Sequence, residues 1–532
     1  MLLSRRQLHA LSRDPAVLWR AVLITFGAFF LTALWAGVQR PPPQTPPGIL
    51  DLRNQGIREI LQADPLDRAA LLRELRADAR RTAVWQQHAE TGNDEGEDPG
   101  QLNLPRLLAL SPLPASEQDA IVLWYAAIIS GKVPPDLIPR MESLAMPGAP
   151  SLPRTMAADL QRLSRDYQRA LASYEAAGAA PDGGEARRRA VDLALSRGWA
   201  SEADRLLAQP AYYEAVHAVP DHLSEETARH QLDVRVLLRR TLAYSASVLH
   251  KTDFLLLSIL TATVWFISLH KACRLPRRQW WFSLAGIPLG MFSTVVTLVL
   301  MDLQEARNGL SDSALAGPAL LYQIAGVGLR EEFSKLLCLL PLLWLLRKGS
   351  PVQALMAASC TGLGFALKEN IMYYQSSDGS AVLGRYLTAN FMHLAMTGLT
   401  GHALFRFLRY PKNFGPAFLA TFCGMVMLHG FYNFSQGAYG GQLDHEISRL
   451  FPFIVGGLAW YYFQTIRQDQ DRAPQALSAQ AVFLLGTAVV MGTLLNFLVW
   501  ENGWGMALEA FIPAVLSAAM LCWLFSHLLR DA

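Results

Sequence analysis

The sequence contains little charge for its length. Asp, Glu, Lys and Arg make up 17% of its 532 residues, whereas ordinary soluble domains contain roughly 25%. Hydrophobic residues make up 52%, and the net charge is only +3. This composition predicts a membrane protein with a soluble part attached. The small net charge argues against nucleic acid as a partner.

Cysteine is also scarce. The five cysteines lie in the C-terminal half, in or beside apolar runs, and no two form a CxxC pair. A zinc finger or a redox pair is therefore not expected. A free cysteine on a membrane helix usually behaves as a small hydrophobic residue.

Apolar runs long enough to span a bilayer recur along the chain. A spanning helix needs about 20 mostly apolar residues. Ten runs meet this need, at 21–38, 254–270, 280–301, 320–346, 352–374, 387–408, 417–434, 450–466, 481–500 and 506–529. We expect an all-α polytopic membrane bundle of about ten spans.

The distribution of Lys and Arg predicts the orientation of these spans. With the N-terminus inside, the inner segments carry sixteen of them, and the short outer loops carry only Arg307, Arg385 and Arg449. Positive charge favours the cytoplasmic side, so both termini are expected there. The first run is longer than the roughly 7–15 apolar residues of a signal peptide, which favours an uncleaved anchor.

Residues 39–250 form a long segment between the first two runs, and this topology places it outside the membrane. It opens with RPPPQTPPG, which is typical of a stiff spacer. The patterns at 155–178 and 183–209 predict two antiparallel helices. The segment shows no strand alternation, phosphate loop or metal-ligand cluster. We expect a soluble α-helical extracytoplasmic domain; paired helices would also fit a solenoid-like module that binds a protein partner.

The resulting domain order has four parts. Residues 1–38 are expected to form the cytoplasmic N-terminus and first anchor, and 39–250 the soluble domain. Residues 251–466 are expected to form the transmembrane core, and 467–532 two additional spans.

Charged residues interrupt the fourth run. The stretch LREEFSKLL places Arg330, Glu331, Glu332 and Lys335 within an apolar segment. Each ionisable group near the bilayer centre costs roughly 2.5–3.5 kcal/mol. An i, i+4 ion pair between Glu331 and Lys335 is the structural alternative to a functional role.

Polar residues then follow at spacing four on the next three runs. This spacing places each set on one helix face. The sets are Phe365, Glu369 and Tyr373; His393, Thr397 and Gly401; and His429 and Asn433. Taken singly, each fits helix packing or a hydrogen bond to a neighbouring helix. So many titratable groups on four consecutive runs instead indicate one functional cluster.

These four patterns resemble the motifs of a known family. EEFSK matches EExxK, FALKENIMY matches FxxxExxxY, HLAMTGLTG matches HxxxTxxxG, and HGFYN matches HxxxN. In this order, residues 280–466 resemble the PrsW family of intramembrane proteases. That family is related to the CAAX-processing and bacteriocin-processing membrane endopeptidases.

The resemblance implies cleavage of a peptide bond in a membrane protein, within or near the lipid bilayer. An anti-sigma factor or a similar signalling protein is the implied substrate class, and the bacterial inner membrane the implied location. The implied catalytic residues are Glu331, Glu332, Glu369, His393, His429 and Asn433, supported by Lys335, Phe365, Tyr373 and Thr397. By analogy, Glu331 or Glu332 is the general base, with His429 and Asn433 beside the oxyanion.

Two chemistries remain open at this point. A buried glutamate can activate water without a metal. Alternatively, Zn²⁺ can be held by two histidines and a carboxylate, here His393, His429 and Glu332. The sequence has no HExxH motif, and we lean slightly towards a metal-optional glutamate mechanism.

Two other functional classes also bury such groups. A proton-coupled transporter does so, but the EE motif is not duplicated in the second half as an internal repeat would require. A non-catalytic membrane sensor or scaffold is the third class, and the intact motif set argues against it.

Overall fold

The computed structural model describes residues 10–39, 133–144, 151–218, 222–276, 279–308, 316–436, 442–470 and 477–530, with a few isolated positions besides. Every regular element within these ranges is a helix. The all-α expectation is therefore confirmed for the described residues. The chain divides into two compact units, Pro42–Asp233 and Met1–Pro41 with Val234–Ala532.

Where the structure describes the unit Pro42–Asp233, short helices pack on their neighbours in chain order. They are α7 (Leu137–Leu144), α8 (Ser151–Leu163), α9 (Tyr167–Gly178), α10 (Gly184–Ser196), α11 (Ala200–Leu207), α12 (Pro210–His217) and α13 (His222–Gln231). Small and aromatic side chains of α9 to α12 form one continuous core.

Each of the two long helices expected in this unit is in fact a pair of shorter ones. The run 155–178 breaks between α8 and α9, where Arg165 has a φ of 65°, and Asp166 then caps α9 through the Arg169 amide. The run 183–209 breaks between α10 and α11 at Gly198, whose φ is 68°. These left-handed residues end the first helix of each pair.

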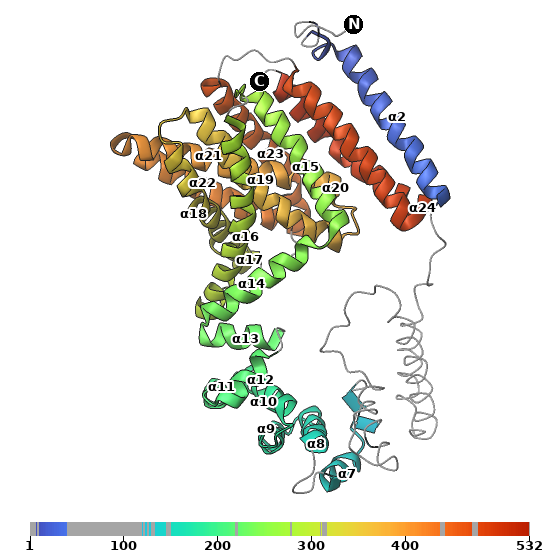
Figure 1. The fold of residues 1–532 in the computed structure, drawn as a ribbon, viewed down its shortest axis with the longest axis vertical. Coiled ribbons are helices and arrows are strands. Elements are labelled where there is room, and N and C mark those ends of the chain that lie inside the picture. Colours follow the sequence, from blue (N-terminus) through green and yellow to red (C-terminus); the bar gives the residue numbers. More distant parts are fainter. Residues whose placement is uncertain are drawn as a thin grey trace. The chain divides into compact units, whose positions relative to one another are not determined.

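The second unit contains the helices that correspond to the apolar runs (Figure 1). They are α2 (Pro15–Gln39), α14 (Val234–Leu249), α15 (Thr252–Ala272), α16 (Trp280–Asn308), α17 (Ala316–Leu321), α18 (Leu329–Leu345), α19 (Pro351–Ser376), α20 (Val382–Leu387), α21 (Ala389–Arg409), α22 (Pro411–Gln436), α23 (Gln442–Asp469) and α24 (Ala479–Arg530). A π-helical segment, η2 (Tyr322–Gly328), joins α17 to α18.

The boundary between the units differs from the one expected at residue 250. The contacts divide the chain at Asp233. Helix α14 packs against α16 and α19, so it belongs with the membrane helices. Its hydrophobic pattern alone did not reveal this, because an amphipathic helix can pack on a soluble core or on a membrane bundle.

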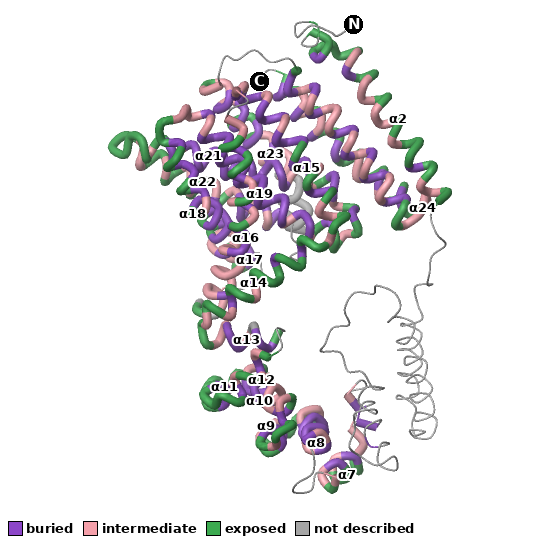
Figure 2. The backbone as a smooth tube through the Cα atoms, viewed as in Figure 1, coloured by how far each residue is buried: buried purple, intermediate pink, exposed green. Residues whose placement is uncertain are grey.

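Five of the described helices are long and apolar enough to cross a bilayer: Pro15–Gln39, Thr252–Ala272, Trp280–Glu305, Pro411–Ser435 and Ala479–Arg530. The last covers two of the expected runs, and Gly503 between them has non-helical backbone angles. Helices α19 and α21 are largely buried inside the bundle (Figure 2). Their polar residues face other helices, so their hydropathy is a poor guide to whether they span.

Glycines bring α16, α19 and α21 close together. A Cβ at Gly286 would lie 2.6 Å from the Ala357 carbonyl oxygen, and one at Gly290 would overlap the Thr361 carbonyl. Gly286 and Gly290 form a GxxxG pattern, which allows close helix packing in membranes. A Cβ at Gly362 would overlap the His393 carbonyl. Helix α19 is therefore held tightly between α16 and α21.

Candidate active site

The EE motif follows directly on the π-helical segment η2. A π-helix displaces the following residues around the helix axis and is frequent at functional sites. The Gln304 side chain donates to the Ala325 carbonyl inside this segment at 3.2 Å. A Cβ at Gly430 would lie 2.5 Å from Ile324 Cα, so α22 can approach η2 closely. This approach brings His429 to the start of α18.

Helix α18 separates its polar and apolar side chains into two faces. Phe333, Leu337 and Trp344 are exposed and turn away from the bundle. Glu332 and Lys335 are fully buried. The charged groups therefore face other helices rather than lipid, which removes much of the cost of placing them in a membrane.

The Lys335 ammonium lies at the centre of the cluster. It donates to Glu332 Oε1 at 2.9 Å and to Glu331 Oε2 at 3.4 Å. It also contacts His393 Nδ1 at 2.8 Å. The Phe365 ring lies beneath it, with its centroid 4.0 Å from Nζ. One cation thus links three helices, α18, α19 and α21.

Each of the two histidines is paired with a carboxylate. His393 Nε2 lies 2.9 Å from Glu369 Oε2, and His429 Nδ1 lies 2.9 Å from Glu332 Oε1. From these distances we assign the ring protons to the two nitrogens that face Glu369 and Glu332. The other nitrogen of each ring is then an acceptor. His393 Nδ1 accordingly faces the Lys335 donor, and His429 Nε2 lies 3.4 Å from Glu331 Oε2.

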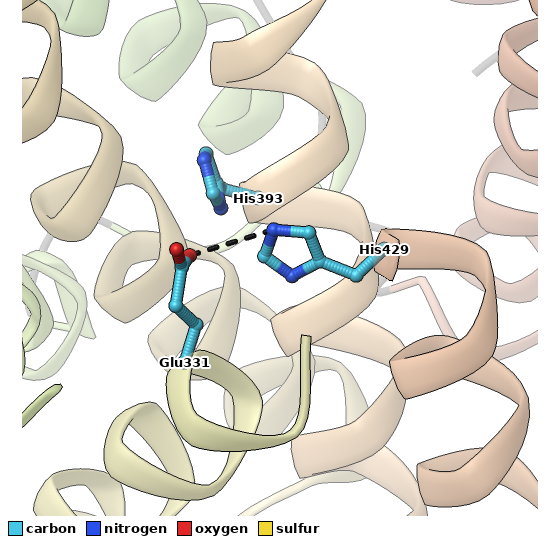
Figure 3. Close-up of side chains that lie close together, drawn as sticks. All are labelled: Glu331, His393 and His429. Atoms are coloured by element: carbon cyan, nitrogen blue, oxygen red, sulfur yellow. Dashed lines mark ion pairs between the residues drawn. The ribbon is translucent and has the colours of Figure 1, made fainter. Parts of the chain in front are cut away.

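Glu331, His393 and His429 converge from three helices (Figure 3). One ligand atom from each lies within 4.8 Å of the others, and all three residues are buried. Two histidines and a carboxylate form a known catalytic zinc set that leaves one position open. A histidine that ligates a metal usually donates its other N–H to a carboxylate or carbonyl. The residues present therefore fit a catalytic divalent metal.

Glu331 occupies the place in this set that the sequence assigned to Glu332. The two residues are adjacent on α18, so their side chains point about 100° apart. Glu332 instead accepts hydrogen bonds from His429, Lys335 and Thr397, the last at 3.4 Å. Glu331 is also the more accessible of the pair, with its side chain 11% exposed against 0% for Glu332.

Arg385 completes the surroundings of Glu369 and was not among the residues expected from sequence. Its Nη2 lies 3.0 Å from Glu369 Oε2, and its Nε donates to Asn370 Oδ1 at 2.7 Å. The guanidinium lies over the Tyr373 ring, 3.7 Å from the centroid. In the sequence analysis, Arg385 was one of the positively charged residues of the short outer loops. Its place in VLGRYL, an otherwise apolar segment, was the signal that could have indicated a buried role.

Asn433 is the expected site residue that the structure leaves outside this network. It lies one helical turn after His429 and is half-buried. Among the described residues, no hydrogen bond of its side chain is found. The other nine expected residues form a connected set: Glu331, Glu332, Lys335, Phe365, Glu369, Tyr373, His393, Thr397 and His429.

Comparison with protein families gives one match. Residues 278–458 match the PrsW family of intramembrane metalloproteases. This region is a PrsW-family domain. It contains every residue of the network just described, whereas the unit Pro42–Asp233 and helix α24 lie outside the PrsW match. Searches of curated proteins and of solved structures give no match.

The PrsW domain and the apolar helices together identify an integral membrane protein. The resemblance inferred from the four motifs is thus confirmed. Intramembrane proteolysis is the activity of the PrsW family, and it implies a membrane protein as substrate and the bilayer as surroundings.

Proposed function

We propose that this chain is an intramembrane endopeptidase that hydrolyses a peptide bond at Glu331, His393 and His429. The observation that carries the proposal is the pair of carboxylate–histidine contacts, both 2.9 Å. They leave His429 Nε2 directed to Glu331, and His393 Nδ1 directed to the Lys335 ammonium that also contacts Glu331. Two oriented histidines beside a third carboxylate suit hydrolysis better than simple helix packing.

We further propose that Glu331, His393 and His429 hold a zinc ion. When bound, the ion supplies Lewis-acid polarisation of water and of the scissile carbonyl. This reverses the slight preference for a metal-optional mechanism that was inferred from the motifs alone. The reason is the second nitrogen of each ring, because Glu369 and Glu332 fix both histidines in the orientation that ligands need.

The remaining residues position these groups and handle the proton. Glu331 offers one carboxylate oxygen to the metal group. Its other oxygen would accept the proton of the attacking water, because this side chain is the more accessible of the two carboxylates on α18. The same carboxyl group then returns this proton to the leaving amide nitrogen. Lys335 holds Glu331 and Glu332 in place from one side.

Arg385 supports this arrangement from a distance. It pairs with Glu369, which in turn contacts His393. Held by Arg385, Glu369 keeps the His393 ring in one tautomer. Arg385 is therefore a positioning residue rather than a catalytic one.

The proposed substrate is a membrane-anchored signalling protein such as an anti-sigma factor. The proposed location is a bacterial inner membrane, with about ten spans, both termini in the cytoplasm and residues 39–250 outside. The Lys and Arg distribution supports this orientation. The stacked helices α8 to α13 support a role for the unit Pro42–Asp233 in binding the extracytoplasmic part of a protein partner.

The test compares new protein termini in membranes of cells that express the wild type, Glu331→Gln or Asp469→Asn. Asp469 pairs with His402 at 2.9 Å in the same unit, away from the proposed centre. We expect termini inside or beside apolar spans with the wild type and Asp469→Asn, and none with Glu331→Gln. Identical termini in all three samples would refute the protease, and would leave a transporter or sensor as the explanation of the buried charges.

A further inference from the structure

Helix α14 has an unusual place in the chain. It follows the last residue of the unit Pro42–Asp233 and packs with the membrane helices. Only two residues separate its end at Leu249 from α15, which begins at Thr252 and is long and apolar enough to span. Figure 1 shows α14 crossing the end of the bundle at which α15 starts. A membrane-spanning α15 would place α14 at the level of a membrane surface.

One face of α14 is fixed to the bundle. Leu237, Thr241, Ser245 and Val248 are buried. The Tyr244 hydroxyl donates to the Met372 sulfur at 2.9 Å, and Lys368 Nζ donates to Ser245 Oγ at 2.5 Å. Both partners lie on α19. These contacts determine which sides of α14 remain exposed.

The flank next to this buried face is apolar but exposed. Val234, Leu238, Leu242 and Leu249 are 47%, 41%, 45% and 37% exposed. They recur at spacings of four, four and seven, so they form one continuous stripe along the helix. A stripe of four large aliphatic side chains is unfavourable in water.

The next flank carries positive charge. Arg235 and Arg239 are both exposed and lie one turn apart. Each follows a member of the apolar stripe by one residue, and so lies about 100° further round the helix. An apolar stripe bordered by arginines is the pattern of a helix that lies in the membrane interface.

We propose that α14 is an interfacial helix that binds anionic lipid headgroups. Its apolar stripe enters the boundary between headgroups and acyl chains, and Arg235 and Arg239 bind lipid phosphates. Continuity with α15 and the charge of the arginines favour lipid as the occupant over another protein. Because α14 holds Lys368 and Met372, on either side of Glu369, the lipid surface also fixes the end of α19 that carries this residue.

The first experiment uses photo-cross-linking from the full chain in nanodiscs of phosphatidylglycerol and phosphatidylcholine. Benzoylphenylalanine replaces Leu242 on the apolar stripe or, as the control, Ser247 on the other exposed side. We expect lipid adducts from position 242 and several-fold fewer from position 247. Adducts of position 242 with residues 42–233 would instead show that the soluble unit covers the stripe, and would overturn the proposal.

The second experiment measures the phosphatidylglycerol retained by purified Arg239→Gln. Arg140→Gln, at an exposed arginine of α7, is the matched control. We expect about a fivefold weaker preference for phosphatidylglycerol over phosphatidylcholine in Arg239→Gln, and no change in the control. Equal retention by both variants would exclude the headgroup contact. Neither readout depends on proteolysis, so the result is independent of the proposed enzyme activity.

Discussion

Two buried clusters of charge in this protein are built in different ways. In the unit Pro42–Asp233, Trp124, Tyr174 and Arg189 all donate to the single carboxylate of Asp159. We call this the Asp159 cluster. In the membrane unit, the Glu331 centre contains Glu331, Glu332, Lys335, Glu369, His393 and His429.

The two clusters differ in the groups that surround each carboxylate. In the Asp159 cluster, three donors converge on one carboxylate from three directions, as expected of a buried charge that serves stability. Burial, with Asp159 beside it, raises the pKa of Tyr174, so the phenol stays protonated and remains a donor.

The Glu331 centre contains three carboxylates and two titratable histidines, with Lys335 inside it and Arg385 beside it as the cations. His429 Nε2 faces Glu331, and His393 Nδ1 faces the Lys335 ammonium, which also contacts Glu331. A buried group that only stabilised the fold would not need this arrangement. The contrast therefore separates a structural charge cluster from one that is suited to chemistry.

The largest expected effect is the loss of activity in Glu331→Gln. The amide keeps the shape of the side chain but cannot accept the water proton, so we expect cleavage to fall by roughly 10²–10⁴-fold. The thermal midpoint should remain close to that of the wild type. Cleavage of a co-expressed membrane substrate and thermal unfolding of the purified protein provide the two readouts. More than a tenth of wild-type activity in this variant would contradict the assigned role.

Asp159→Asn should have the opposite effect to Glu331→Gln: stability should fall, whereas cleavage activity should remain. The change removes the buried carboxylate that Trp124, Tyr174 and Arg189 share, and leaves Arg189 with Glu185 as its remaining anionic partner. We expect the unit Pro42–Asp233 to lose about 2 kcal/mol of unfolding free energy. Hydrogen exchange of α8 to α10 measures the loss. Asp192→Asn is the matched control, because Asp192 and Arg162 form a half-exposed pair for which we expect about 1 kcal/mol or less. Similar losses of unfolding free energy in both variants would mean that the Asp159 cluster stabilises the unit no more than the half-exposed Asp192–Arg162 pair does.

The third effect concerns metal affinity. Glu369→Gln removes the carboxylate that orients His393, and we expect binding of Zn²⁺ to weaken by about 10–100-fold. Competition with a coloured chelator measures the affinity. Asp469→Asn alters the carboxylate–histidine pair of His402, which is not part of the three-residue group, and should leave the affinity unchanged. A similar change in zinc affinity in both variants would mean that the Glu369–His393 pair has no greater role in metal binding than the Asp469–His402 pair.

The smallest effect is expected for Phe365→Leu. The ring contacts the Lys335 ammonium at 4.0 Å, a contact of about 1 kcal/mol. We expect cleavage to fall about fivefold with zinc content unchanged. Phe333→Leu changes an outward-facing ring on α18 and provides the comparison. If both substitutions had the same effect, the contact with Lys335 would not matter.

Much of the site could be predicted from the sequence because the spacing of four defines a face within each helix. His393 with Thr397, and Glu369 with Phe365, were placed correctly by this rule. It gives no information on how one helix is turned towards another. The choice between Glu331 and Glu332 depends on the turn of α18 after η2, and no local pattern in YQIAGVG predicted a π-helix.

Contacts between distant segments were harder to foresee. Arg385 reaches Glu369 across sixteen residues and had been counted as a loop base. The assignment of α14 to the membrane unit depends on Lys368 and Met372, more than a hundred residues away. Helix lengths were predicted wrongly where one residue with a positive φ breaks the chain, as at Arg165 and Gly198.

The zinc content of the purified protein tests the central claim most directly. Elemental analysis would compare the wild type with His429→Ala and His402→Ala, which remove a buried histidine inside and outside the Glu331 centre. We predict about one zinc per chain in the wild type and in His402→Ala, and almost none in His429→Ala. A wild-type protein that cleaves its substrate without bound metal, or equal zinc in all three proteins, would contradict the metal centre at Glu331, His393 and His429.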